Sequence, residues 1–246
     1  MAAQLTVSAS AVQAASANVD RLRALPRAAV AVDQVRAELV LVQGGFALRD
    51  AIRQEQELVY TLASQSDLEA ATLPLLPAAR SAELAQVDQA LRSLWRMAGY
   101  DAGAQVHPRR NKRFAASEPV DALLGYYRAS ATRTGIDWTY LAAINFIESD
   151  FGRVNGPSSA GALGPMQFLP STFREYGGGG DIMSPRDSVQ AAASMLARNG
   201  APGDYGRAVL RYNHSQEYVK AVGSYAAAMR SDTLWLTRFY YWSTYG

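Results

Sequence analysis

The stretch INFIESDFG at residues 144–152 decides how the rest of the chain is organised. Within it, Glu148 follows Ile144 by four positions and Leu141 by seven, a spacing that places the three side chains on one stripe of an α-helix. A carboxylate on an apolar stripe is costly unless a partner compensates its charge. Glu148 is therefore either the buried ion-pair partner of an arginine or an acid whose raised pKa serves chemistry.

The segments on either side of this stretch carry residues that begin and end helices. Asp137 is a predicted N-cap for a helix over 138–150 that Gly152 ends. The other predicted boundaries are Ser117 with Pro119 to Gly135, Ser184 to Asn199–Gly200, Asp204 as the start of the next helix, and Ser215 to about Arg230. The segment 117–230 is therefore predicted to be helices joined by short turns.

The N-terminal region from Gln4 to about Met97 is rich in Ala, Leu and Val and has little strand signal. We expect amphipathic helices, with a break at Gly44–Gly45 and further helices over 46–64 and 81–97. Leu84, Val87, Leu91 and Leu94 repeat at helical spacing, so one face of the last helix needs a partner. The predicted fold class is all-α.

The predicted domain organisation follows from changes in composition along the chain. An N-terminal helical region occupies residues 1–100, a linker occupies 101–116, a helical domain occupies 117–230, and an aromatic C-terminal tail over 231–246 packs on the body. The linker contains the basic cluster 109–113, which is interpreted as a solvated connector and not as a contact to nucleic acid or to an anionic wall polymer.

Composition excludes several classes of protein. The 246 residues are 49% hydrophobic and 19% charged with a net charge of +2, which is ordinary for a globular protein. The sequence has no cysteine and only two histidines, His107 and His214, without metal-ligand spacing. We therefore expect no metal site and no cofactor. No apolar run is long enough for a membrane span, and the N-terminus shows no recognisable signal peptide, so either a leader was removed or none existed.

Three blocks of sequence can be combined into one site. They are Glu148-Ser149, then GALGPMQF at 161–168, then RYNHS at 211–215 with Tyr218 beyond. A Glu-Ser pair at a helix end, a Gly-x-Met-Gln block and a later Tyr-Asn pair resemble the goose-lysozyme-like lytic transglycosylases of bacteria, the soluble lytic transglycosylase family, over residues 117–230. The resemblance implies a lysozyme-like catalytic domain that cleaves peptidoglycan glycan strands.

The mechanism implied by this resemblance uses one acid. Glu148 protonates the β-1,4 bond between N-acetylmuramic acid and N-acetylglucosamine, and its carboxylate then deprotonates the muramoyl 6-hydroxyl, which closes a 1,6-anhydro ring. The candidate second carboxylates are Asp150, Glu175, Asp181 and Asp187, and the sequence singles out none of them. Two alternatives stay open: a muramidase in which Glu148 acts with water, and a catalytically silent wall-binding or assembly protein.

The resemblance also implies substrate-binding residues. Ser149 orients the acid, Ser158 bonds a substrate N-acetyl group, and Met166, Gln167 and Phe168 line the groove. Tyr212 stabilises charge at the reacting sugar, and Asn213 and Tyr218 complete the set. Met166 and Phe168 can also be plain core residues, and Asn213 can be the residue that ends a helix. We expect a monomer that binds peptidoglycan, contacts no nucleic acid and acts outside the cytoplasm, because its substrate lies there.

Overall fold

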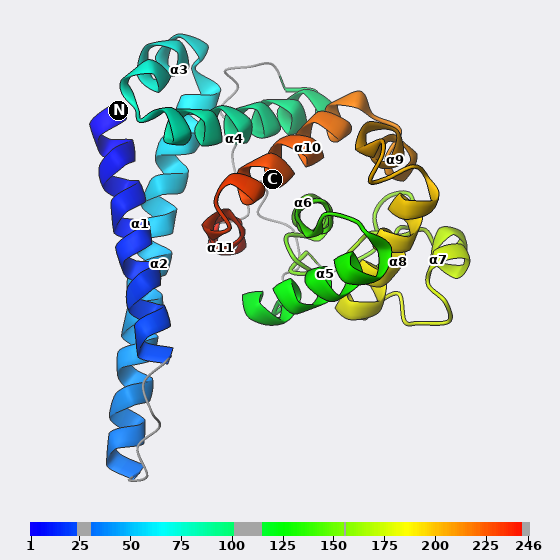
Figure 1. Ribbon diagram of the computed structural model, residues 1–246, viewed down its shortest axis with the longest axis horizontal. Helices are drawn as coiled ribbons and strands as arrows, with labels where there is room; N and C mark the ends of the chain where they lie inside the picture. Colours follow the sequence, from blue (N-terminus) through cyan, green and yellow to red (C-terminus); the bar gives the residue numbers. More distant parts are fainter. Residues whose placement is uncertain (24–30, 101–114, 155, 243–246) are drawn as a thin grey trace. The chain divides into compact units, whose positions relative to one another are not determined.

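Helices dominate the structure, a computed structural model that describes residues 1–23, 31–100, 115–154 and 156–242 (Figure 1). These residues contain no β-strand, and an isolated bridge joins Leu163 to Phe168. The all-α prediction is therefore confirmed. The chain divides into two compact units, residues 1–81 with 241–243 and residues 82–240 with 244–246. The helix break that Pro26 predicts and residues 101–114 of the predicted linker lie outside the described residues.

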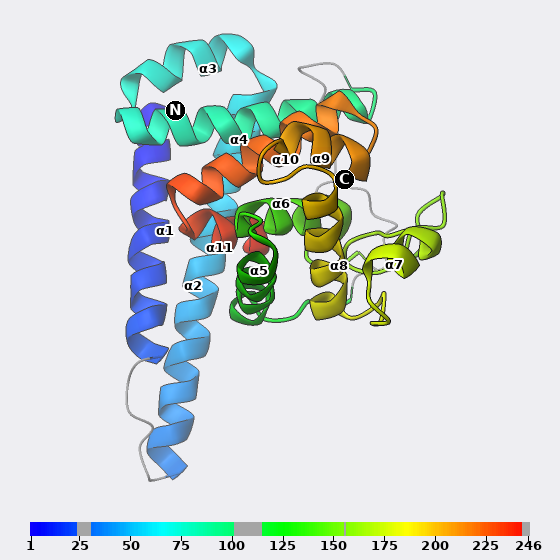
Figure 2. The ribbon, with the colours of Figure 1, turned by 45° about the vertical axis from the view of Figure 1, so that its right-hand side comes forward.

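The first unit is built on a long pair of packed helices, α1 (Ala2–Arg23) and α2 (Ala31–Ser64) (Figures 1 and 2). Leu5, Val12 and Val19 recur every seventh residue of α1 and are buried. In α2 the buried residues Leu48, Ile52, Glu55, Val59 and Leu62 are four and three positions apart, the a/d spacing of a coiled-coil seam, and Gln56 and Ala63 beside this seam are also buried. These residues belong to the buried faces of the two packed helices.

The expected helix break at Gly44–Gly45 is wrong, because α2 runs through both glycines. A glycine in a helix costs only about 1 kcal/mol relative to alanine. Packing of α1 along α2 outweighs this cost, so the local signal does not decide the backbone here.

A short helix α3 (Ser66–Thr72) and a 3-10 turn η1 (Leu73–Leu75) lead into α4 (Ala78–Met97). In the first unit, Glu55 of α2 is fully buried and accepts a hydrogen bond of 2.5 Å from Arg80 at the start of α4. Leu84, Val87 and Leu91 of α4 belong to the second unit and are buried, as their spacing predicted, whereas Leu94 is half-buried.

The second unit surrounds α6 (Trp138–Ser149) with α5 (Val120–Thr134), α8 (Pro185–Arg198) and α10 (Gln216–Ser231) (Figure 1). Five consecutive residues of α6, from 141 to 145, are buried, because this part of the helix is packed on several sides. The remaining elements are α7 (Pro170–Tyr176), α9 (Tyr205–Tyr212) and α11 (Leu234–Tyr241).

Four N-cap predictions hold in this unit, whereas Pro119 and not Ser117 is the N-cap of α5, and Asp150 and not Gly152 is the C-cap of α6. The side chains of Asp137, Ser184, Asp204 and Ser215 each accept a hydrogen bond from a backbone N–H of the first helical turn that follows. Gly135 closes α5 with a φ of 74°, the left-handed conformation that glycine adopts most readily. Residues 170–176, which were not predicted as a helix, form α7.

Aromatic residues of the tail contribute to both cores. In the second unit, Phe239 stacks on Phe146 of α6 with ring centroids 5.1 Å apart and also contacts Tyr225. In the first unit, Trp242 lies 5.6 Å from the ring of Tyr60. Both tail residues are buried, so the aromatic content of this segment serves packing.

Candidate active site

The candidate acid lies in the last turn of α6, where the backbone reverses direction. Asp150 caps the helix in the left-handed conformation with a φ of 50°, and Phe151 and Gly152 follow with φ values of 59° and 85°. These residues end α6 at Ser149, and Glu148 in its last turn is half-buried. The other end of α6 is tied at Asp137, which accepts a 2.8 Å hydrogen bond from Arg230 of α10.

The carboxylate of Glu148 has one short hydrogen bond. The hydroxyl of Tyr218 donates to Glu148 Oε1 at 2.6 Å. Burial of the carboxyl raises the pKa of Glu148 to about 7, and the hydrogen bond from Tyr218 acts in the opposite direction because it stabilises the charged form. An acid with this pKa is partly protonated near neutral pH and can donate a proton.

Two tyrosines surround this acid. Tyr218 lies in the first turn of α10 and is buried, and both burial and the nearby charge of Glu148 raise its pKa. Tyr212 at the end of α9 donates to the backbone oxygen of Met166 at 2.7 Å. Burial raises the pKa of Tyr212, and the charge of Glu148 raises it further, so this phenol also lies within electrostatic range of the acid. Both phenols remain protonated donors at neutral pH.

A buried network, which sequence reasoning missed, connects the helix to the Gly-x-Met-Gln block. Asn145 Nδ2 donates to the carbonyl oxygen of Pro165 at 2.7 Å, and its Oδ1 accepts from the Tyr127 hydroxyl at 2.6 Å. Ser149 Oγ donates to the same Pro165 oxygen at 2.5 Å and accepts from Gly152 N at 2.8 Å. The sequence signal for this network was Asn145, a polar residue among the apolar residues of α6. The Ser149 hydroxyl therefore contacts the loop and not the Glu148 carboxylate.

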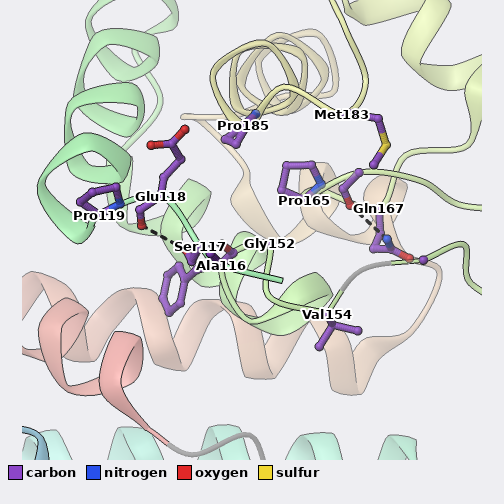
Figure 3. Close-up of a pocket in the computed structure, with 13 residues that line it drawn as sticks. Ala116, Ser117, Glu118, Pro119, Gly152, Val154, Pro165, Gln167, Met183 and Pro185 are labelled. Carbon is purple, nitrogen blue, oxygen red and sulfur yellow. Dashed lines mark hydrogen bonds between the residues drawn. The ribbon is translucent and has the colours of Figure 1, made fainter. Parts of the chain in front are cut away.

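The Gly-x-Met-Gln block forms a tight turn whose side chains point in different directions. Met166 is fully buried, and Phe168 is buried against the rings of Phe173 and Tyr212. Both side chains are therefore core residues, which is the alternative that the sequence left open for them. Gln167 is half-exposed, adopts a φ of 47° and donates from Nε2 to Gly164 O at 3.0 Å. Figure 3 shows Gln167 beside Met183 on the wall of a pocket.

The remaining predicted site residues lie at loop positions. Ser158 is exposed, and its hydroxyl oxygen accepts from the backbone N–H groups of Ala160 and Ala162, which closes the small-residue loop. Asn213 is half-exposed and is the C-cap of α9, so it does end that helix. The structure thus brings Glu148, Tyr218 and Tyr212 together and links Tyr212 to the backbone of Met166. The hydrogen bonds of the Ser158 hydroxyl stay within its own loop.

Asp150 and Asp187, two of the four candidate second carboxylates, have structural contacts. Asp150 is buried and pairs with Arg153 at 3.3 Å. Asp187 accepts a hydrogen bond from Asp181 N, and its pKa is lowered chiefly by this bond. Glu175 is exposed. Among the residues that the structure describes, no group of three or more His, Cys, Asp or Glu side chains lies close enough to hold a metal ion.

The fold and the site together define an all-α, lysozyme-like domain with an acid at the end of its central helix. Residues 125–235 match the family model described as the transglycosylase SLT domain. This chain thus contains a domain of that lytic transglycosylase family, as its motifs indicated. The match covers less than half of the 246 residues and includes Glu148, Gln167, Tyr212 and Tyr218. No curated protein and no solved structure matched the chain.

A domain of this family implies transglycosylase activity in general and peptidoglycan as its substrate. The described part of the chain contains no helix that is long and apolar enough to cross a membrane.

Proposed function

We propose that this protein is a lytic transglycosylase that cleaves the β-1,4 bond between N-acetylmuramic acid and N-acetylglucosamine and leaves a 1,6-anhydromuramic end. The observation that carries the proposal is the environment of Glu148. Its carboxyl is half-buried with a pKa of about 7, it accepts a bond from Tyr218, and it lies inside the region that matches the transglycosylase family. A single group with this pKa can act first as an acid and then as a base.

In the first step, protonated Glu148 donates its proton to the glycosidic oxygen while the bond from that oxygen to C1 of the muramoyl sugar breaks. The developing positive charge on the sugar is met by the newly formed carboxylate. The Tyr218 hydroxyl stabilises that carboxylate through the 2.6 Å hydrogen bond, since a donor to a charged acceptor favours the charged form.

In the second step, the Glu148 carboxylate removes the proton of the muramoyl 6-hydroxyl while the oxygen of that hydroxyl bonds to C1 of the same sugar. The acid is regenerated, and no water is consumed. Two of the candidate second carboxylates fit this scheme: Asp150 is paired with Arg153, and Asp187 accepts a hydrogen bond that holds a turn. We infer that this chemistry takes place outside the cytoplasmic membrane, where peptidoglycan lies.

Replacing Glu148 by glutamine tests the proposal. Glu148→Gln keeps the size of the side chain and removes the proton, so we expect muropeptide release from purified peptidoglycan to fall by about 10³-fold. Glu175→Gln, which changes an exposed carboxylate on α7, serves as the matched control and should keep wild-type activity.

Product mass distinguishes the proposed reaction from its alternatives. Anhydromuramic ends weigh one water less than hydrolysed reducing ends, and we expect the anhydro mass. Hydrolysed ends alone would identify a muramidase. A wild-type protein that binds strands and releases no product would be a silent wall-binding protein, and equal activity in Glu148→Gln would remove Glu148 from the mechanism.

A further inference from the structure

A pocket of about 310 Å³ lies beside the candidate active site in the second unit (Figure 3). It reaches the site through Gln167 and Pro165, since the Pro165 oxygen accepts hydrogen bonds from Asn145 and Ser149 next to the catalytic acid. Glu148 itself does not line the pocket. A volume of this size is at the small end of ligand pockets, which span roughly 300–1,000 Å³. It suits a substituent of a polymer better than a stretch of the polymer.

One wall of the pocket comes from outside the region that matches the transglycosylase family. Residues 116–119 precede α5, whereas the match begins at residue 125. Backbone and side-chain bonds fix this wall: Ala115 N donates to Arg153 O at 2.7 Å, Ser117 Oγ donates to Phe151 O at 2.7 Å, and the Tyr240 hydroxyl donates to Glu118 O at 3.0 Å. The wall is therefore held against the chain that follows the catalytic helix.

The chemistry of the lining selects a class of ligand. Glu118 is the only charged residue among the described residues that line the pocket, and Ser117 and Gln167 supply polar groups. The rest of the lining is glycine, alanine or larger apolar residues such as Phe151, Met183 and Pro185. The Glu118 carboxylate has no ion-pair or hydrogen-bond partner among the described residues, and Figure 3 shows its side chain extending toward Pro185. An aliphatic chain that ends in an ammonium group complements an apolar pocket with one free carboxylate.

We propose that this pocket binds the ammonium-bearing side chain of a peptide stem on the glycan strand, with Glu118 as the partner of the ammonium group. This inference rests on the proposed function, because it assumes that glycan strands occupy the neighbouring site. Sugars carry no positive charge, and the carboxylates of the stem peptide are repelled by Glu118. The side-chain amine of an uncrosslinked stem is thus the group on such a strand that matches the pocket, and the pocket selects strands with free amines.

Three substrates test this proposal with one protein: strands whose stem peptides have free side-chain amines, the same strands after N-acetylation of these amines, and strands stripped of peptides. We expect wild-type kcat/KM to be about threefold higher on free amines than on acetylated ones, the size of a solvent-exposed ion pair. Glu118→Gln should abolish this preference and leave kcat/KM on stripped strands unchanged. Glu175→Gln should retain the preference.

Each other result is informative. A preference that persists in Glu118→Gln, or no preference in the wild-type protein, overturns the assignment of the pocket while turnover of stripped strands still supports the transglycosylase. An equal loss on all three substrates assigns Glu118 to folding or to the common site and also overturns the proposal; circular dichroism separates these two causes. Failure of the wild-type protein to cleave any strand overturns both the proposed function and the inference that rests on it.

Discussion

Glu148 illustrates how one side chain acquires its chemistry from a balance of two effects. Burial favours the neutral acid, and the hydrogen bond from Tyr218 favours the carboxylate, with a resulting pKa of about 7. No ion pair to Glu148 is recorded among the described residues, so the arginine partner considered from the sequence is not what compensates this acid. A cation there would have lowered the pKa and removed the proton that the first step requires.

The pH dependence of activity follows from this balance. The proposed first step needs protonated Glu148, so kcat/KM should decline as the pH rises through about 7. Tyr218→Phe removes the donor that lowers the pKa, so the pKa rises and the alkaline decline moves to higher pH. The maximal rate should fall by about 100-fold, since one donor to developing charge is lost. A pH–rate profile measures both effects.

Tyr126→Phe, on α5, is the matched control and should leave the profile unchanged. A decline that stays in place or moves to lower pH in Tyr218→Phe would contradict the role assigned to this phenol.

At the scale of elements, the turn over 164–167 is held by close contact with the segment before α8. Gly164 has a φ of 73°, and a Cβ built on it would lie 1.9 Å from the carbonyl oxygen of Ile182. Gly161 has a similar φ of 79°, yet a Cβ there would meet nothing within 4 Å. A side chain at Gly161 would therefore meet backbone strain alone, whereas a side chain at Gly164 would meet the same strain and also a lack of space.

We expect Gly161→Ala to lower the free energy of unfolding by about 1 kcal/mol, the cost of the left-handed conformation alone. Gly164→Ala should cost at least about 3 kcal/mol, because the methyl group must displace backbone and cannot do so cheaply. It should also reduce activity, since Gln167 and the Pro165 carbonyl belong to the same turn. Urea denaturation and muropeptide release measure the two effects. Equal losses in both variants would show that the close approach to Ile182 is unimportant.

At the scale of the whole molecule, the chain consists of two compact units, and the buried ion pair between Glu55 and Arg80 belongs to the first. Glu55 is fully buried, so Glu55→Gln replaces the negative charge that faces the mostly buried Arg80 guanidinium by a neutral amide. We expect a loss of about 3–5 kcal/mol in the stability of this unit. Asp50→Asn, which breaks the exposed pair with Arg53, should cost less than about 1 kcal/mol.

Hydrogen exchange measured by residue locates the loss. Amides of α2 after Gly45 should exchange faster in Glu55→Gln, while amides of α6 and α10 serve as the internal reference. Uniformly faster exchange in both units would show that the ion pair stabilises the entire chain as one cooperative structure.

The sequence by itself determined the helical class and most helix ends of the second unit, and it singled out Glu148 as the candidate acid. Asp137, Ser184, Asp204 and Ser215 act within one helical turn, so their effect can be predicted without knowledge of distant contacts. The blocks around Glu148, Met166 and Tyr212 likewise carried the family signal that the comparison with the SLT domain supports.

Only the tertiary structure decided what surrounds that acid and which side chains face solvent. The continuity of α2 through Gly44–Gly45 depends on packing against α1, the Tyr218 bond to Glu148 joins residues 70 positions apart, and the burial of Met166 depends on the turn that presents it. The wall at Ser117 and Glu118 is placed by bonds to Phe151 and Tyr240. Such contacts depend on how distant segments pack, and local spacing contains no information about them.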